Sequence, residues 1–194
     1  LGPPASCEGN AMIRLALTED AAAIRAIYAP YVTDTAISFE IEPPDTPQMA
    51  ARIETALTAW PWLVEEQDGA IIGYAYAGQH RTRAAYRWSV DVAVYVARGS
   101  HRRGLGRSLY RPLLDILKAQ RFRAAFPGIT LPNAASIGPH AALGFVPVGA
   151  YRNVGYKAGA WHDVGWWELD LGAPHGAPHE PLPLAALDLP EYWV

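Results

Sequence analysis

The chain has 194 residues, of which 51% are hydrophobic and 18% charged, so it is long enough for one domain with a full core. That composition is typical of a compact soluble protein and excludes a disordered one. The formal charge of −3, without a long basic stretch, gives no reason to expect nucleic acid as a partner. No stretch approaches the ~20 apolar residues of a membrane helix, so no membrane partner is expected either.

The sequence predicts one domain with two flanking segments. Residues 1–11 lack the charged and apolar regions of a signal peptide and are expected to be a leader or an added segment. The domain is expected to cover residues 12–172. Five prolines after it predict an extended or loosely docked tail over residues 173–194. The one cysteine, Cys7, excludes an intramolecular disulfide and favours a reducing compartment, so the cytoplasm is the predicted location.

The first half of the chain predicts a strand, two helices and a hairpin. Apolar and polar residues alternate in the strand, and Thr18 is expected to be the N-cap of the first helix, which Pro30 should weaken beyond that residue. An Asp-Gly turn is expected to join the two hairpin strands. The expected elements are a strand at Ile13–Leu17, a helix toward Tyr31, a loop at Phe39–Pro47, a helix at Gln48–Leu57, and strands at Trp62–Gln67 and Ala70–Gly78.

The second half predicts alternating strands and helices. Its long helix has leucines at helical spacing, and Gly144 is expected to close its short one. The expected elements are a polar loop at Gln79–Arg87, a strand at Trp88–Val96, a glycine loop and helix at His101–Gln120, a strand at Arg123–Leu131, a helix at Ala134–Leu143, and strands at Val146–Arg152 and Val164–Leu171 around a loop at Asn153–Asp163. This order indicates a single mixed α/β (α+β) domain.

Two glycines, Gly104 and Gly106, stand where the strand ending in Val96 is expected to meet the long helix. Backbone amides exposed there, together with the helix dipole, can hold a pyrophosphate, and neighbouring arginines supply positive charge. A P-loop is excluded because no Lys-Ser/Thr pair follows the glycines. A dinucleotide fingerprint is excluded because its third glycine is absent.

A second segment downstream makes the interpretation of the glycine loop more specific. Leu131-Pro132-Asn133 is followed by His140 and by Leu143-Gly144-Phe145. Together with the glycine loop, these residues resemble the GNAT superfamily of acetyltransferases, whose glycine motif is Q/R-x-x-G-x-G/A. The resemblance implies the acyl-CoA N-acyltransferase fold: a mixed, twisted sheet flanked by helices, with its fourth and fifth strands splayed apart. The chain departs from the motif at His101, which occupies the Q/R position.

Further segments resemble the phosphinothricin and methionine sulfoximine acetyltransferase branch of that superfamily, from about Ile13 to Leu171. They are Ile37-Ser38-Phe39-Glu40 with Glu42-Pro43, Gly73–Gly78, Ala85–Asp91, and Gly155-Tyr156-Lys157 with Trp161-His162-Asp163-Val164-Gly165. The last block is the most specific of these. The branch implies a small amino-acid-like amine as acceptor and a homodimer with shared active sites.

The resemblance implies acetyl-CoA as cosubstrate and no metal. Its diphosphate is expected on the amides of the glycine loop, and its pantetheine arm between the splayed strands, with Asn133 as an amide clamp. The residues expected to bind it are Val94, Tyr95, Val96, Arg102, Arg103, Gly104, Leu105, Gly106, Arg107, Ser108 and Asn133. Pro127-Gly128 suits the splay, because proline donates no ladder bond and glycine permits close approach.

Acetyl transfer needs an unprotonated amine, a polarised thioester and a proton for the departing thiolate. Asp91 stands where the related enzymes carry Glu and is expected to take the amine's proton through a water, since its side chain is one methylene shorter. His140 is the expected acid or base near neutral pH. The Val94 amide is expected to stabilise the oxyanion. Which of Asp91 and His140 is the general base stays open at this point.

Acceptor binding is expected to combine positive charge with an aromatic wall. Arg81 and Arg83 could make bidentate contacts to a carboxylate or phosphinate. Phe39, Tyr86 and Trp88 are expected to line the side-chain pocket. Lys157 and His162 are placed in a loop that, in this branch, reaches the active site or the neighbouring subunit. The full set of expected substrate residues is Phe39, Arg81, Arg83, Tyr86, Trp88, Lys157 and His162.

Two alternatives stay open. The first is an acetyltransferase for another amine, such as a polyamine, an aminoglycoside or a protein N-terminus. The arginines before Tyr86 disfavour cationic acceptors, which would want an acidic cleft. The second is a non-catalytic acyl-CoA-binding module, which the presence of Asp91 and His140 disfavours.

Overall fold

A computed structural model describes residues 11–100, 104–172 and 176–189. Its eight strands form one mixed sheet in the order β1-β2-β3-β4-β5-β8-β6, with β7 pairing β8 and only β4 and β5 parallel. The strands are β1 (Ala11–Leu15), β2 (Trp62–Gln67), β3 (Ala70–Gln79), β4 (Ser89–Val96), β5 (Ala124–Phe126), β6 (Gly128–Leu131), β7 (Val146–Lys157) and β8 (Ala160–Asp170), and the helices are α1 (Ala21–Thr33), α2 (Thr46–Leu57), α3 (Leu105–Ala119) and α4 (Ala134–Ala142). This arrangement confirms the predicted mixed α/β fold.

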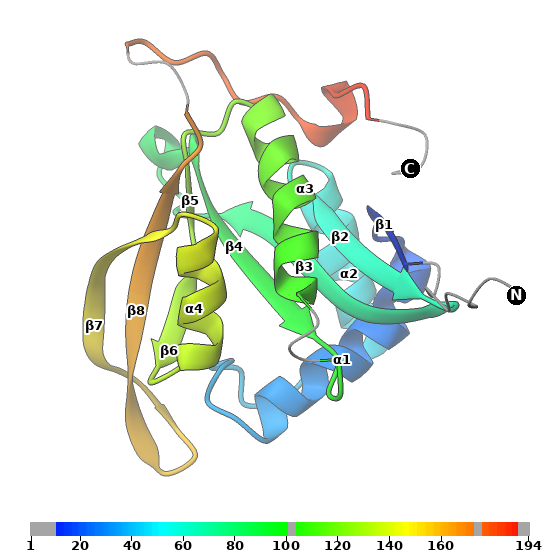
Figure 1. The fold of residues 1–194 in the computed structure, drawn as a ribbon, viewed down its shortest axis with the longest axis vertical. Helices are drawn as coiled ribbons and strands as arrows, with labels where there is room; N and C mark the ends of the chain where they lie inside the picture. The colour runs from blue at the N-terminus through cyan, green and yellow to red at the C-terminus, as the bar shows by residue number, and fades with distance from the viewer. Residues whose placement is uncertain (1–10, 101–103, 173–175, 190–194) are drawn as a thin grey trace, which may run out of the picture.

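The sheet separates two apolar clusters. α3 packs on one face, in front of the sheet in Figure 1, over alternate residues of β3 and β4 such as Ala77 and Val92. α1 and α2 pack on the opposite face, against the strand residues that alternate with those under α3, including Tyr74 and Tyr95. The predicted leucine face of α3 is confirmed, since Leu109, Leu113 and Leu117 are fully buried. None of the helices in the described ranges is both long and apolar enough to cross a membrane.

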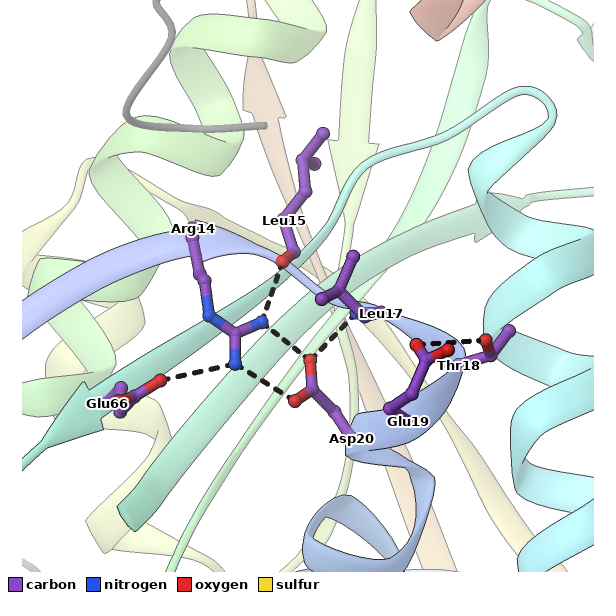
Figure 2. A network of polar contacts seen from close by, with 7 residues as sticks. All are labelled: Arg14, Leu15, Leu17, Thr18, Glu19, Asp20 and Glu66. Carbon is purple, nitrogen blue, oxygen red and sulfur yellow. Dashed lines mark hydrogen bonds and ion pairs between the residues drawn. The ribbon is translucent and has the colours of Figure 1, made fainter. Parts of the chain in front are cut away.

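The start of the domain is held by a polar network around Arg14 (Figure 2). Arg14 makes two hydrogen bonds to Asp20, at 2.6 and 2.9 Å, and one to Glu66 of β2 at 3.2 Å. The Asp20 carboxylate also accepts the amide of Leu17. The prediction that Thr18 is the helix N-cap is therefore wrong. Thr18 instead opens a short 3-10 turn, and its hydroxyl donates to Glu19.

Both N-terminal helices differ from their predicted bounds. α1 continues through Pro30 to Thr33, because Val32 in the turn beyond the proline is buried against the sheet, which offsets the hydrogen bond that proline removes. α2 begins at Thr46, two residues before the expected start. The Asp45 carboxylate accepts the Gln48 amide, and the Gln48 side chain accepts the Asp45 amide in return. Pro47 thus lies in the first turn of α2, where its missing N–H costs no helical bond.

The strand predicted at Arg123–Leu131 is two strands on either side of Pro127. β5 lies parallel to β4, and the last pair in register is Asp91 with Phe126. β6 pairs only with β8, from Gly128 onward. The two central strands therefore part immediately after Asp91, which confirms the predicted splay of the fourth and fifth strands.

The prediction of a loop at Asn153–Asp163 is wrong. β7 and β8 run through it as one long hairpin that turns at Ala158 and Gly159, both with positive φ. The register shifts twice along this hairpin, once between Tyr151 and Gly155, so its residues lack the strict alternation by which a strand is predicted.

The described part of the tail docks on the domain. Leu182 exchanges hydrogen bonds with Gln120 at the end of α3, and Leu184 is buried. The carbonyl of His179 accepts the indole N–H of Trp88, and Glu180 pairs with Arg87. The tail therefore packs more tightly than a loose extension, at the end of the sheet where β4 begins.

Candidate active site

The N-terminus of α3 carries the predicted phosphate site. Gly104 has φ +78°, a conformation that favours glycine, and its carbonyl accepts the amides of Arg107 and Ser108. The amides of Leu105 and Gly106 precede the first helical hydrogen bond and are available to a ligand. An added Cβ at either glycine would meet nothing within 4 Å. This open cradle fits a diphosphate, and those two amides are the groups that could hold it.

Not every predicted phosphate contact belongs to this cradle. The hydroxyl of Ser108 lies within hydrogen-bond distance of the carboxylate of Glu65, a buried residue of β2, and of the Leu105 carbonyl. Ser108 therefore ties α3 to the sheet and does not point at a phosphate. Arg102 and Arg103, like His101, lie outside the described residues.

A groove extends from this cradle into the gap between β4 and β6. Cavities of about 280, 60 and 380 Å³ follow one another along it, and Ile37 and Tyr95 line all three. Gly104, Leu105, Gly106 and Arg107 line the first. Pro127 and Gly128 line the second, and Phe39, Thr130 and Trp166 line the third. The groove thus connects the phosphate cradle with the predicted acceptor side.

The edge of β4 that faces this gap follows from its hydrogen bonds. The Ala97 amide donates to Ile72 of β3 at 2.8 Å, whereas the hydroxyl of Tyr31 donates to the Val96 carbonyl at 2.6 Å. Successive amides of a strand point to opposite edges, so Val94 shares the edge of Val96 and its N–H points into the gap. The amide of Tyr95 points to β3, and its ring lines the groove. Of the three residues, Val94 is the one with an amide suited to an oxyanion.

Asn133 caps α4 beside the groove. Its side-chain carbonyl accepts the Ser136 amide at 3.1 Å, so the side-chain oxygen is engaged in the helix. The residue lines the first and second cavities, and its side-chain NH₂ is the group left for a pantetheine amide. The predicted clamp is therefore available only as a donor.

His140 is buried and forms a pair with Tyr110 of α3. Its Nδ1 lies 2.7 Å from the Ser136 carbonyl, which can only accept, so Nδ1 carries the proton. Its Nε2 then accepts the Tyr110 hydroxyl at 3.0 Å. Burial lowers the pKa of His140 and raises that of Tyr110 well above its usual value. A neutral imidazole backed by a protonated phenol therefore lines the groove, and sequence analysis did not single out Tyr110.

Burial of His140 predicts a loss of stability on acidification. Its pKa is lower in the folded protein than the ~6.5 of an unfolded chain, so the unfolded state binds more protons between the two values. Stability is present above about pH 6.5 and is lost as the pH falls through this window. Urea denaturation at pH 5 and pH 7 should differ more for the parent than for His140→Gln. An equal difference in both proteins would contradict this assignment.

Asp91 forms a hydrogen-bonded pair with His80 at the point where β4 and β5 part. The Nδ1 of His80 lies 2.6 Å from Oδ1 of Asp91. Burial raises the pKa of the Asp91 carboxyl, and the hydrogen bond and charge of His80, with the charge of Arg81, partly offset that rise. His80 was missed by sequence analysis because it falls in a polar stretch expected to be loop. Its signal is the hairpin register, which pairs Gly78 with Asp91.

Some of the predicted acceptor residues lie at the third cavity or beside His80, and others do not. Phe39 lines the third cavity, Arg81 lies over the ring of Trp166 at 5.5 Å, and the ring of Tyr86 lies 5.9 Å from that of His80. Arg83 is exposed. Trp88 lines none of the cavities described here, since its indole donates to the tail, and the expectation that it walls the pocket is corrected on this geometry.

Lys157 and His162 lie on the β7–β8 hairpin and not in a loop. The buried ammonium of Lys157 donates to the carbonyls of Val32 and Ser38, both at 2.6 Å. The Nε2 of His162 donates to the Lys157 carbonyl at 3.0 Å. The expected contact of Lys157 with an acceptor is therefore corrected: it fastens the segment that carries Phe39. Within the described ranges, no group of three or more His, Cys, Asp or Glu side chains is placed to hold a metal ion.

Comparison with known proteins identifies this class of fold and site. Residues 13–166 match the acetyltransferase (GNAT) domain, and the chain belongs to that family. It is an acetyl-CoA-dependent N-acetyltransferase.

Two individual relatives and one solved structure show which GNAT enzymes the chain is similar to. The chain is 40% identical over 170 residues to phosphinothricin N-acetyltransferase of Streptomyces viridochromogenes, which covers 88% of this chain and 92% of the relative. It is 36% identical over 167 residues to the L-methionine sulfoximine/L-methionine sulfone acetyltransferase of Salmonella typhimurium, covering 86% and 97%. A GNAT superfamily phosphinothricin acetyltransferase from Sinorhizobium meliloti in complex with acetyl-CoA superposes with a TM-score of 0.83 at 33% identity, covering 88% and 94%.

Proposed function

We propose that this enzyme transfers the acetyl group of acetyl-CoA to the primary amine of a small amino-acid-like acceptor, namely phosphinothricin, methionine sulfoximine or methionine sulfone. The observation that carries the proposal is the groove, because it leads from the open amides of α3 past the Val94 amide to the aromatic pocket around Phe39. The names of the relatives support this acceptor class. Detoxification of such compounds, in the cytoplasm, is the role it implies.

Acetyl-CoA supplies an activated acetyl thioester, and the chain has a group for each remaining need. The amides of Leu105 and Gly106 bind the diphosphate, and the amide of Val94 stabilises negative charge on the thioester oxygen. Asp91 removes the proton of the acceptor ammonium through a water. The Tyr110–His140 pair supplies a proton to the departing thiolate through the Tyr110 hydroxyl.

The acceptor lies with its side chain against Phe39 and its acidic groups toward Arg81. Arg81 stacks on Trp166, a wall of the third cavity, and its guanidinium can pair with a carboxylate or phosphinate in two hydrogen bonds. Arg83, exposed at the start of the next turn, remains a proposed second cation for these groups.

A panel of amines tests this function. Each compound is incubated with acetyl-CoA and the parent enzyme, and release of free thiol is followed. Turnover is expected for phosphinothricin, methionine sulfoximine and methionine sulfone, and weak or no turnover for polyamines and aminoglycosides, because Arg81 repels cations. No thiol release with any of the three amino acids would refute the proposed acceptor class. Turnover of an N-terminal peptide instead would favour the protein acceptor.

The alternative of a non-catalytic acyl-CoA-binding module makes a separate prediction. The double variant Asp91→Ala/His140→Ala should retain acetyl-CoA binding while losing turnover if the chain is an enzyme that uses these groups. A double variant with the parent's rate would refute the proposed roles whatever the acceptor.

We further propose that the enzyme is a homodimer. The β7–β8 hairpin exposes apolar side chains that no other described part of the chain covers: Val146, Val148, Tyr151, Val154, Tyr156 and Trp161, all at least half exposed. Light scattering is expected to give about twice the 21.1 kDa mass of one chain. Trp161→Glu should shift the mass toward that of one chain, because a charge in an apolar interface is costly. If the parent protein has the mass of one chain at micromolar concentration, the proposed dimer is contradicted.

A further inference from the structure

His80 and Asp91 share one face of the sheet. The antiparallel register pairs Gly78 of β3 with Asp91 of β4. Side chains two residues apart on a strand point to the same face, so His80, just after β3, lies diagonally from Asp91. This is also the face of Tyr76 and Tyr95, on which the α1–α2 segment with Phe39 lies. The register of the β3–β4 hairpin therefore places His80 next to Asp91.

The imidazole of His80 is held more firmly than its partner. Its ring stacks on Phe126 with centroids 4.6 Å apart, and the ring of Trp166 stands nearly perpendicular to it with centroids 6.1 Å apart. The His80 side chain is 13% exposed and that of Asp91 38%. Within the described ranges, Oδ1 of Asp91 contacts His80 and Oδ2 has no hydrogen-bond partner. The histidine thus lies behind the carboxylate, with the second oxygen open.

We propose that His80 is a positioning residue for acetyl transfer: its Nδ1–H holds Oδ1 of Asp91 and so directs Oδ2 toward the acceptor amine. This inference rests on the proposed function. The side chain of an aspartate is one methylene shorter than that of a glutamate, and a fixed neighbour makes up for part of that shorter reach by keeping the carboxylate in one orientation. Preorganised catalytic groups of this kind depend on such supporting hydrogen bonds.

The proton balance is simple. One proton leaves the acceptor ammonium for Oδ2 of Asp91, directly or through a water, and is later released to solvent. The free amine forms the new C–N bond as the C–S bond of the thioester breaks. The nitrogen then loses its second proton to solvent, while the departing thiolate takes a proton from the Tyr110 hydroxyl, which solvent replaces, to give CoA. The Nδ1–H of His80 stays on the imidazole throughout. Its role is therefore to orient the carboxylate, as the buried aspartate of a catalytic triad orients its histidine.

Two groups stabilise the charge of this carboxylate, His80 and Arg81. The titratable side chains nearby are those of Tyr76, on the same face of β3, and Tyr86, whose ring lies 5.9 Å from that of His80. Burial raises the pKa of Asp91 while His80 opposes that rise. Removal of His80 therefore raises the pKa further, and the base is ionised only at higher pH.

The test compares three substitutions of His80 with the parent. Asparagine places its side-chain NH₂ where Nδ1 stood and can keep the hydrogen bond. Glutamine places its NH₂ where Nε2 stood, and alanine has no donor. We expect His80→Ala and His80→Gln to lower kcat at pH 7 about tenfold or more, which is part of the ~10²–10⁴-fold that a general base contributes. His80→Asn should recover most of the rate. KM for acetyl-CoA should change little, and the melting temperature should fall by a similar amount in His80→Ala and His80→Asn, since both lose the ring stacked on Phe126.

The pH profile separates positioning from a loss of packing. In His80→Ala the acid limb of kcat/KM is expected to move to higher pH, with rate regained at alkaline pH. A uniform fall of the rate at every pH, or a His80→Asn variant as slow as His80→Ala, would overturn the proposal. So would a parent-like rate in all three variants.

A spectroscopic titration makes the result independent of turnover. The carboxyl carbon of Asp91, observed by ¹³C NMR, should titrate at higher pH in His80→Ala than in the parent, and His80→Asn should lie between them. An unchanged midpoint refutes the pairing. If no amine in the panel is acetylated, the acceptor class fails, whereas this titration still decides whether His80 controls Asp91.

Discussion

Asp91→Asn is expected to lower kcat by about 10²–10⁴-fold, the usual contribution of a general base. Asparagine has nearly the same shape, and its side-chain oxygen can still accept the Nδ1–H of His80. It cannot, however, take a proton from the acceptor ammonium. The loss should therefore appear in turnover and not in binding. Steady-state kinetics with an accepted amine, and calorimetric titration with acetyl-CoA, measure the two quantities separately.

The control for this variant is Asp163→Asn. Asp163 is also a strand aspartate with a hydrogen bond, because its carboxylate accepts the Asn153 amide on the β7–β8 hairpin, but it lies on β8 and is not paired with His80. Asp163→Asn should keep the parent kcat within about twofold, since surface substitutions of this kind are usually small in effect. A kcat for Asp91→Asn within threefold of the parent would show that the amine loses its proton without this carboxylate.

Gly106→Glu is expected to weaken acetyl-CoA binding about a hundredfold or more. The glutamate side chain would enter the open space in front of α3, where an added Cβ meets nothing within 4 Å. It would place a negative charge beside the amides that hold the diphosphate, so that attraction becomes repulsion. Because the space is empty and Gly106 has helical backbone geometry, the fold should tolerate the change. Calorimetric titration with acetyl-CoA gives the affinity, and thermal melting reports on the fold.

A matched variant separates this effect from added charge alone. Gly138 is also a helical glycine, in α4, with nothing within 4 Å of a built Cβ. Gly138→Glu should bind acetyl-CoA almost as tightly as the parent. Gly104 is unsuitable as a control because its φ of +78° would add backbone strain. Equal affinity in Gly106→Glu and Gly138→Glu would exclude the helix N-terminus as the diphosphate site.

Local pattern predicted most of the regular structure. The Asp68-Gly69 turn and the leucines of α3 lie where expected, since both signals depend on neighbouring residues alone. The errors arose where long-range packing decided. Pro30 lies within a helix that continues for another turn, and the β7–β8 hairpin extends through residues that lack a clean alternation. Bulges of this kind depend on the partner strand, which a linear pattern does not contain.

The candidate site divides in the same way. Spacing placed Gly104 and Gly106 between a strand and a helix, where a few neighbouring residues set the geometry, and the resemblance to the GNAT superfamily pointed to Val94 on that strand. The contacts that assign chemical roles join residues far apart in the chain: Tyr110 with His140, 30 residues on, and Ser38 with Lys157, 119 residues on. Sequence analysis therefore expected Lys157 to contact an acceptor, whereas the fold engages it with two backbone carbonyls.

The sequence by itself determined the α/β architecture and the place of the phosphate cradle, because backbone periodicity and turn chemistry are local properties, and its resemblance to the GNAT superfamily determined the class of protein. Only the tertiary structure decided which side chains act in pairs. His80 and Asp91 are 11 residues apart, yet their contact depends on the register of a hairpin and on the ring of Phe126 from a third strand. The physical reason is that a hydrogen bond requires two groups within about 3 Å, and distances on that scale between separate segments are set by packing.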